Sequence, residues 1–346
     1  MEKKIKVGIS IGDLNGIGLE IIIKTFKDNR MMDFCTPIIF GSSQVASIHR
    51  KTLNMQDFSF NTINNFKNIN HKKANLLNIW KKNIDITLGK PSTESGQYSL
   101  DSIKKATDAL KNKEIDVLVT APINKASIQE KVTSFIGHTE FFEKNFEGNA
   151  LMIMISEVMK IAFVTGHVPL NEVKKLITCK SIILKTKQLN TSLTQDFRIR
   201  KPKIAILGLN PHAGEDGLLG DEETEHIIPA IKKLKEEGII VFGPYSADSF
   251  FTHKNLKHFD GILSMYHDQG LTAFKTLSFS DGVNYTAGLN VIRTSPVHGT
   301  AYEIAGKGIA DEKSFREAIF LACEIYKKRT EFNLLNENPL KIKTKK

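Results

Sequence analysis

The stretch KIAFVTGH at residues 160–167 decides the fold class, because a short apolar strand runs directly into a glycine and a histidine. The same pattern recurs in KIAILGLNPH at residues 203–212 and in GILSMYH at residues 261–267. Short runs of valine, isoleucine and leucine between longer amphipathic stretches are typical of buried parallel strands joined by crossover helices. The sequence therefore predicts an α/β fold with a mostly parallel sheet.

The rest of the chain repeats this alternation of strand and helix. We expect strands at residues 5–11, 115–120, 151–155, 161–165, 203–207 and 261–265. We expect helices at residues 19–27, 100–111, 170–189, 222–237 and 312–328. The Asn-rich stretch 58–82 has no clear period and indicates a surface excursion. No Pro/Gly/Ser-rich linker divides the chain, so two domains would be interwoven.

Composition excludes several classes of protein. The 346 residues are 41% hydrophobic and 25% charged, as in an ordinary soluble globular protein. The net charge of +10 comes from scattered lysines, which favours a solvated surface that attracts anions over nucleic-acid binding. Cys35, Cys179 and Cys323 form no Cys-x-x-Cys pair, and the first apolar run is too short for a signal peptide or a membrane span. We therefore expect a cytoplasmic protein without a membrane or nucleic-acid partner.

Three histidines each follow the carboxyl end of an expected strand: His167, His212 and His267. In parallel α/β sheets that end is where ligands bind, so the three imidazoles can converge on one divalent metal. Zn²⁺ is the natural occupant for imidazole ligands, with Mg²⁺ or Co²⁺ as alternatives. Asp268 and Glu215 would orient two of these rings. The alternative is that each histidine only caps its own loop.

Other polar residues point to an anionic substrate. GHTE at residues 137–140 starts an expected helix and suits a phosphate or carboxylate. Lys125 ends another strand, and Lys275, Asn284 and Arg293 follow His267 along the chain. The Gly-rich turn at residues 8–20 matches neither the Rossmann fingerprint nor the P-loop, so it is either a tight turn or part of a ligand site.

These residues resemble the 4-hydroxythreonine-4-phosphate dehydrogenase family of pyridoxal phosphate biosynthesis. The similar stretches are 11–20, 120–125, 137–140, 210–215, 266–271 and 293–311, in the family's order. The resemblance implies two interwoven α/β/α domains like those of isocitrate and isopropylmalate dehydrogenases, with the active site in the cleft between them. Residues 1–130 and 290–346 would form the terminal domain. Residues 131–289 would form the central domain, which carries the dimer contact.

The resemblance also assigns roles to individual residues. Metal ligation falls on His167, His212 and His267, from both chains of a homodimer with the active site at its interface. Asp248 matches a family aspartate near the metal and is a candidate base. Substrate contact falls on five residues: His138, Thr139, Lys275, Asn284 and Arg293.

The stretch 295–310 is similar to the adenosine-binding loop of isocitrate and isopropylmalate dehydrogenases. By that resemblance His298 and Gly299 would lie at the adenine and Glu303 at the ribose. A carboxylate at the ribose favours NAD over NADP, although NADP stays an alternative. The chain departs from the family at Leu14, Asn15 and Leu19, at residues 272–274 and at residues 58–82. These departures put fine substrate preference in doubt.

The expected activity is the NAD-dependent oxidation of 4-phosphohydroxy-L-threonine at its 3-hydroxyl, followed by decarboxylation to 3-amino-2-oxopropyl phosphate. One alternative substrate is a four-carbon acid-sugar phosphate of the threonate or erythronate type, with a hydroxyl in place of the amine. A second alternative is a metal-dependent hydrolase, because three histidines can also activate water. A third is a non-enzymatic or acyl-transferring phosphate binder. The adenosine-like loop argues against the hydrolase, and the three strand-end histidines argue against the phosphate binder.

Overall fold

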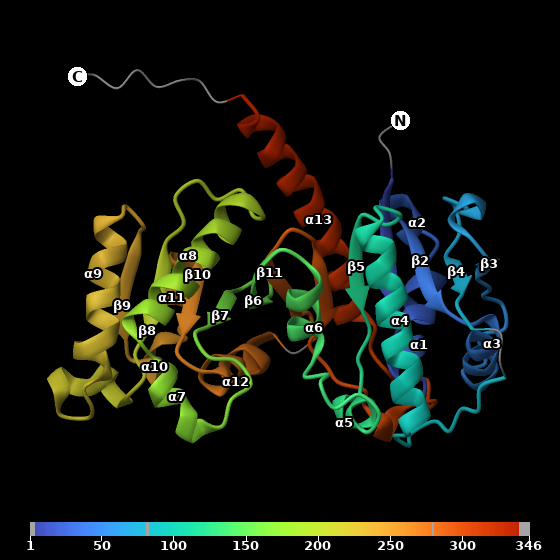
Figure 1. Ribbon diagram of the computed structural model, residues 1–346, viewed down its shortest axis with the longest axis horizontal. Helices are drawn as coiled ribbons and strands as arrows, with labels where there is room; N and C mark the ends of the chain where they lie inside the picture. Colours follow the sequence, from blue (N-terminus) through green and yellow to red (C-terminus); the bar gives the residue numbers. More distant parts are fainter. Residues whose placement is uncertain (1–3, 81–82, 279, 339–346) are drawn as a thin grey trace.

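One twelve-stranded sheet runs through the whole computed structural model, which describes residues 4–80, 83–278 and 280–338 (Figure 1). Hydrogen bonding joins its strands in the order β3-β4-β2-β1-β5-β12-β11-β6-β7-β10-β8-β9. In chain order the strands are β1 Ile5–Ser10, β2 Cys35–Gly41, β3 Asn61–Ile63, β4 Asn75–Asn78, β5 Val117–Thr120, β6 Gly148–Ile155, β7 Lys160–Phe163, β8 Ile204–Leu207, β9 Val241–Tyr245, β10 Gly261–Ser264, β11 Val283–Leu289 and β12 Arg293–Pro296.

The sheet consists of two parallel sets joined by antiparallel strands. The first set consists of six neighbouring strands that pair in parallel: β3, β4, β2, β1, β5 and β12. The second set consists of four parallel strands: β7, β10, β8 and β9. Between the two sets, β11 pairs antiparallel with both β12 and β6, and β6 pairs antiparallel with β7. The predicted α/β class with a mostly parallel sheet is confirmed, and the two halves share one sheet.

The six strands of the first set belong to the segments predicted as the terminal domain. The other six strands belong to the segment 131–289. The domain boundaries themselves stay a prediction, and residues 339–346 of the terminal segment lie outside the described residues.

Helices cover both faces of the sheet, and α13 runs between the two halves and extends beyond the body of the molecule (Figure 1). No helix of the described segments is long and apolar enough to cross a membrane; a cytoplasmic location stays a prediction. The helices are α1 Gly18–Lys27, α2 Met31–Phe34, α3 Ser43–Thr52, α4 Thr93–Lys111, α5 Lys125–Gln129, α6 His138–Asn145, α7 Leu170–Leu176, α8 Cys179–Gln195, α9 Ile228–Glu236, α10 Ala247–Phe250, α11 His253–His258, α12 His267–Ser278 and α13 Lys313–Asn336.

All six predicted strands are present, with ends shifted by one to three residues, but one predicted helix is wrong. The expected helix 170–189 is two helices, α7 and α8, because Thr178 starts a new one. Its hydroxyl accepts a hydrogen bond from the Ser181 backbone N–H at 3.1 Å, and the Ser181 hydroxyl accepts one from the Thr178 N–H at 3.0 Å. This capping box satisfies free N–H groups at the start of α8, so the chain can change direction there.

The predicted surface excursion at residues 58–82 is also corrected. It forms β3 and β4 at the edge of the sheet, although residues 81 and 82 lie outside the described part. Asn75 is fully buried in β4, and its side-chain amide donates to the Pro37 carbonyl at 3.2 Å and the Asn70 carbonyl at 2.9 Å. A buried asparagine that bonds backbone carbonyls replaces the apolar residue that a strand pattern requires.

Candidate active site

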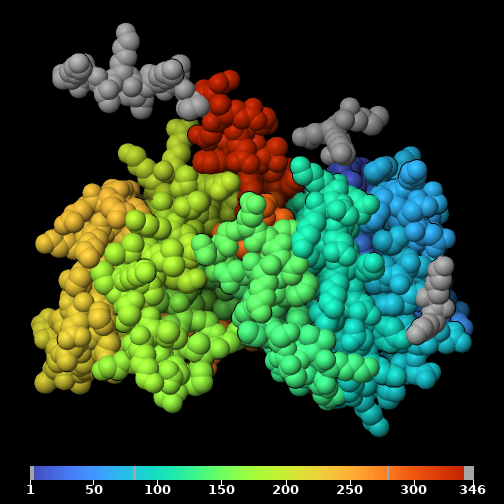
Figure 2. Space-filling model, viewed as in Figure 1, coloured from blue at the N-terminus to red at the C-terminus, as the bar shows by residue number. Residues whose placement is uncertain are grey.

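A cleft of about 400 Å³ lies over β6 and β11, at the centre of the sheet. The surface is indented where the two halves of the molecule meet (Figure 2). Both parallel sets contribute, because Thr120 ends β5, Ser295 lies in β12, and His167 and His267 follow β7 and β10. The cleft brings together nine of the twelve predicted site residues: His138, Thr139, His167, His267, Lys275, Asn284, Arg293, His298 and Gly299.

Arg293 is the most deeply buried cation of the cleft, with 2% of its surface exposed. Its Nε and Nη2 donate to the Thr120 hydroxyl at 3.1 and 2.6 Å, and its Nη1 donates to the Thr286 hydroxyl at 3.1 Å. Its guanidinium also lies 5.7 Å from the centre of the Phe142 ring. No carboxylate forms an ion pair with it among the described residues, and burial lowers its pKa to about 9. A buried charge held only by neutral groups favours an anionic ligand.

Three further polar atoms of the cleft are buried without a hydrogen-bond partner within the described chain: His138 Nε2, Asn284 Oδ1 and His298 Nε2. Burial, followed by the charges of Arg293 and Lys125, holds the pKa of His138 well below its usual value, so this ring is neutral. Buried polar atoms without partners are costly unless water or a ligand bonds them. The cleft therefore has the properties of a binding site for a polar anion.

His167 and His267 lie side by side, with ring centres 4.9 Å apart. Asp268 Oδ1 lies 2.6 Å from His267 Nδ1, so the carboxylate orients that ring as predicted. Burial, then the charges of Lys125 and His267, lowers the pKa of His167, which keeps it neutral and able to bind a metal. However, the described residues contain no group of three side chains that could hold a metal ion. One subunit thus brings two of the three predicted ligands together; the prediction draws the set of three from both chains of a dimer and stays a prediction.

His212 does not line the cleft, because it lies in a separate turn at Pro211–Gly217. His212 and the four residues after it, 213–216, have left-handed φ values between 44° and 82°. Only glycine adopts this conformation readily, so surrounding contacts have to hold the turn. Glu223 does so: its Oε1 accepts the backbone N–H groups of Leu209 at 2.7 Å and Asn210 at 2.8 Å. Glu215, which the sequence suggested as the carboxylate that orients the His212 ring, itself lies in the turn.

Asp248 and Glu303 also lie outside the lining of the cleft. Asp248 is exposed in α10, which packs against the His212 turn, and a hydrogen bond from Ser246 lowers its pKa. Glu303 is exposed in the short 3₁₀ helix Tyr302–Ile304. The predicted base and the predicted ribose contact are therefore not assembled with the other residues in a single subunit.

The Gly-rich turn before α1 supports the loop that carries His298. The Ile17 N–H donates to the Thr300 carbonyl at 3.0 Å, and the Tyr302 hydroxyl donates to Asp13 Oδ2 at 2.9 Å. A Cβ atom at Gly16 would lie 2.8 Å from the Thr300 carbonyl oxygen, so this close approach requires glycine. Of the two interpretations left open by the sequence, these contacts favour a structural turn.

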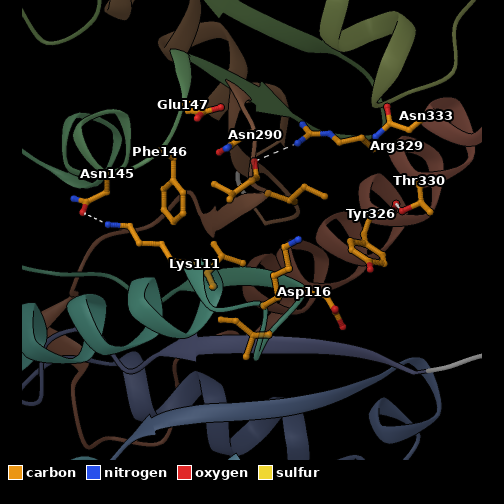
Figure 3. A pocket seen from close by; sticks show the side chains of 15 residues that line it. Lys111, Asp116, Asn145, Phe146, Glu147, Asn290, Tyr326, Arg329, Thr330 and Asn333 are labelled. Carbon is orange, nitrogen blue, oxygen red and sulfur yellow. Dashed lines mark hydrogen bonds between the residues drawn. The ribbon is translucent and has the colours of Figure 1, made fainter. Parts of the chain in front are cut away.

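A larger cavity of about 560 Å³ lies at the opposite, amino ends of β5 and β12 (Figure 3). Two cations that line it, Arg329 and Lys111, are already bonded within the protein. Arg329 donates to Asp196 Oδ1 at 2.8 Å and to the Tyr285 hydroxyl at 2.7 Å, and Lys111 donates to Asn145 Oδ1 at 2.7 Å. Volume alone therefore does not identify the site.

Two charged residues of the cleft, Lys125 and Glu140, are absent from the predicted site residues. Both had a visible signal in the sequence, since Lys125 follows the strand β5 and Glu140 starts the helix α6. The sequence could not show that they face the same cavity, because the cleft forms only when α6 packs on β6 and α5 packs on α4.

Comparison with known proteins identifies relatives over nearly the whole chain. The family model of "Pyridoxal phosphate biosynthetic protein PdxA" matches residues 33–322. A 4-hydroxythreonine-4-phosphate dehydrogenase from Bacteroides thetaiotaomicron is 48% identical over 98% of this chain and 94% of its own. A protein from Oceanobacillus iheyensis named "Putative D-threonate 4-phosphate dehydrogenase" is 36% identical over 94% of this chain and 99% of its own.

Solved structures agree with these relatives. A crystal structure of a 4-hydroxythreonine-4-phosphate dehydrogenase from Klebsiella pneumoniae covers 94% of this chain and 100% of its own, at 29% identity and a TM-score of 0.78. The dehydrogenase names confirm the predicted enzyme class and support a nicotinamide cofactor. The chain belongs to the PdxA family of pyridoxal phosphate biosynthetic proteins.

Proposed function

We propose that this protein oxidises 4-phosphohydroxy-L-threonine at its 3-hydroxyl with NAD, and that the resulting β-keto acid loses CO₂ to give 3-amino-2-oxopropyl phosphate. The relative that is 48% identical is named 4-hydroxythreonine-4-phosphate dehydrogenase, which supports this substrate and an oxidation. The observation that carries the proposal is Arg293, a buried guanidinium without a carboxylate partner among the described residues. A phosphorylated carboxylic acid supplies the negative charge that this site lacks.

Different residues of the cleft would bind different groups of such a substrate. Arg293, Lys275 and Lys125 provide the positive charge for phosphate and carboxylate, and the neutral His138 and the Asn284 amide provide directed hydrogen bonds. Anchoring both ends of a four-carbon chain fixes the 3-hydroxyl, so binding energy away from the reacting carbon serves to orient it. A bound nicotinamide would supply the acceptor for the C3 hydride, and a base at the 3-hydroxyl would take its proton.

The cofactor would extend from the cleft along the His298 loop. His298 and Gly299 line the cleft, and burial lowers the pKa of His298, which leaves a neutral ring with a free Nε2 for the adenosine. The exposed Glu303 lies five residues further on and would accept hydrogen bonds from a free ribose 2′-hydroxyl. This arrangement favours NAD over NADP.

We further propose a homodimer, because one subunit provides only two of the three expected histidines. His212 of the partner subunit would join His167 and His267 to hold a divalent metal, with Zn²⁺ favoured over Mg²⁺ or Co²⁺. Such an ion polarises a substrate hydroxyl and lowers its pKa. Asp248 would reach the same site as base, because it lies beside the His212 turn. Exposed apolar residues near these segments suit burial in a dimer: Val168, Leu170, Leu218, Leu219 and Leu277.

NADH formation from 4-phosphohydroxy-L-threonine, with and without a chelator, tests the reaction. Mixing two inactive variants, His167→Ala and His212→Ala, tests the shared site. Random exchange makes half of the dimers mixed, and each mixed dimer keeps one intact site, so about a quarter of wild-type activity should return. If no activity returns although mixed dimers form, the three histidines do not combine across the interface.

A second candidate substrate is D-threonate 4-phosphate, which the Oceanobacillus relative's name supports. It has the same anionic groups and carries a hydroxyl where the first substrate has an amine. The cation cluster around Arg293 would bind either substrate, so the ratio of the two turnover rates decides between them. The hydrolase alternative finds no support, because the relatives are named dehydrogenases.

A further inference from the structure

A buried carboxylate on the Gly-rich turn holds the loop that carries His298 and Glu303. This residue is Asp13, of which 1% is exposed. Its Oδ2 accepts a hydrogen bond from the hydroxyl of Tyr302 at 2.9 Å, although the two residues are 289 positions apart in the chain. Tyr302 directly precedes Glu303 and begins the short 3₁₀ helix. One hydrogen bond therefore joins the first turn of the chain to the segment proposed to contact the ribose.

The Asp13 carboxylate is bonded by neutral donors. Its Oδ1 accepts the Asn15 N–H at 2.9 Å and the Ser95 hydroxyl at 2.6 Å. Among the described residues, no lysine, arginine or histidine forms an ion pair with this carboxylate. A buried carboxylate without a cation depends on its hydrogen bonds, and a bond to a charged oxygen is stronger than one between neutral groups. The bond from Tyr302 is thus a strong attachment for the loop.

The loop requires such an attachment, because part of its backbone is strained. Ala301 has a left-handed conformation, with φ 45° and ψ 55°. A residue other than glycine pays about 1–2 kcal/mol there, so neighbouring contacts have to hold it. Burial, followed by the charge of Asp13, raises the pKa of Tyr302, so its hydroxyl keeps the proton that it donates. The side chain next to the strained residue therefore provides a lasting contact.

A second set of bonds fastens the far end of the loop to α1. Glu20 Oε1 accepts the Ala310 N–H at 2.9 Å. Lys24 Nζ donates to the Gly308 carbonyl at 2.9 Å and forms an ion pair with Glu20 at 3.0 Å. These bonds act on the last residues of the loop. The bond from Tyr302 acts beside the residues proposed to contact the cofactor.

We propose that Asp13 is a positioning residue for the cofactor, because through the Tyr302 hydroxyl it fixes the loop in the conformation that binds the adenosine of NAD. The inference rests on the proposed function, since it concerns the same cofactor site. Neither residue lines the cleft, and the residues proposed for substrate contact lie on α6, α12, β11 and β12. Because a preorganised loop loses less entropy on binding, this bond should affect NAD and leave the phosphorylated substrate unaffected.

Tyr302→Phe tests the inference, because it removes the hydroxyl and keeps the ring. We expect the dissociation constant and the KM of NAD to rise about 10-fold, the lower end of the range for a hydrogen bond to a charged group. At saturating NAD, kcat and the KM of the phosphorylated substrate should match the wild type. Steady-state kinetics and calorimetric titration with NAD measure these constants. An unchanged dissociation constant, or equal rises in both KM values, would overturn the inference.

Tyr285→Phe is the matched control. The Tyr285 hydroxyl also donates to a buried carboxylate, Asp196 Oδ2 at 2.8 Å, and the residue lies outside the cleft lining. Both variants should lower the free energy of unfolding, but Tyr285→Phe should bind NAD as tightly as the wild type. If both variants weaken NAD binding equally, the effect of Tyr302→Phe is a general loss of stability and the inference is wrong.

A double-mutant cycle shows whether the two residues act through one bond. Asp13→Asn removes the charge of the acceptor and should also raise the dissociation constant of NAD. Combined with Tyr302→Phe, it should raise this constant by a smaller factor than it does alone, because the shared bond is already lost. Fully additive effects would mean that Asp13 does not act through Tyr302.

The same titrations separate this inference from the proposed cofactor. If the wild type does not bind NAD, the proposed cofactor is wrong and the inference fails with it. If the wild type binds NAD and Tyr302→Phe binds it equally well, the cofactor stands and only the role of Asp13 is wrong.

Discussion

Two arginines at opposite ends of the central strands, the buried Arg293 and the half-buried Arg329, have opposite surroundings. Arg293, in the cleft, donates only to the hydroxyls of Thr120 and Thr286. Arg329, in α13, donates to the carboxylate of Asp196 and to the Tyr285 hydroxyl. Burial lowers the pKa of Arg293 to about 9, whereas the pKa of Arg329 is raised, because its acidic partners outweigh its burial.

The difference indicates that Arg293 binds a ligand, whereas Arg329 stabilises the fold. A buried charge with a carboxylate partner and further hydrogen bonds is complete within the protein. A buried charge without one is costly, and a protein retains it where a ligand completes it. By this criterion the cleft is the functional site, although the cavity beside Arg329 is larger (Figure 3).

The largest effect should come from Arg293→Met. We expect kcat/KM to fall about 1000-fold or more, because the variant cannot pair with the substrate's anionic groups. The melting temperature should equal or exceed that of the wild type, since the substitution removes an uncompensated buried charge. Steady-state kinetics measures the change in kcat/KM, and calorimetric melting measures the change in melting temperature. Comparable turnover by the variant would mean that Arg293 does not bind substrate.

The opposite pattern is expected for Arg329→Met. The change leaves the Asp196 carboxylate, which is 2% exposed, without its cationic partner. The hydroxyls of Tyr285 and Ser192 still donate to it, so we expect the free energy of unfolding to fall by about 3 kcal/mol. At a temperature where the variant is folded, its KM should match the wild type. A large KM change with unaltered stability would reverse the assignment.

Inorganic phosphate should distinguish the two arginines without any turnover. At 100 times its dissociation constant, phosphate bound in the cleft should stabilise the wild type by about 2.7 kcal/mol. Arg329→Met should keep this gain, and Arg293→Met should lose it. Denaturant titrations with and without phosphate measure the difference. A phosphate gain that survives in Arg293→Met would place the anion elsewhere.

Two histidines with a buried Nε2 atom, His49 and His138, offer the same contrast with smaller expected effects. His49 is fully buried with its Nε2 2.9 Å from the Leu14 carbonyl, and burial lowers its pKa from 6.5 to about 4. Between pH 6.5 and 4 the unfolded chain therefore binds a proton that the folded chain does not. The free energy of unfolding falls as the pH is lowered through this range.

Between pH 7.5 and 5 this group should cost the wild type about 2 kcal/mol of stability. His49→Gln keeps a donor for the Leu14 carbonyl and should flatten that dependence without changing KM. His138, whose Nε2 has no protein partner among the described residues, should affect KM when changed to glutamine. Melting curves across this pH range, with KM values at neutral pH, test both variants.

The strands could be predicted from sequence more reliably than the helix ends. Apolar runs such as KIAFVTGH are read directly as buried strands, whereas the break at Thr178 depends on a two-residue capping box inside a continuing apolar pattern. The edge strands β3 and β4 were not predicted, because they contain few apolar residues. The buried position in β4 is held by Asn75, whose side chain donates to backbone carbonyls.

The sequence by itself determined the α/β class, the family and nine residues of the cleft, because motifs at the ends of buried strands are read locally. Only the tertiary structure decided that Lys125 and Glu140 face the same cavity and that His212 lies in a separate left-handed turn held by Glu223. These facts depend on how helices pack beside strands far apart in the chain. Local patterns carry no information about which charges finally lack a partner.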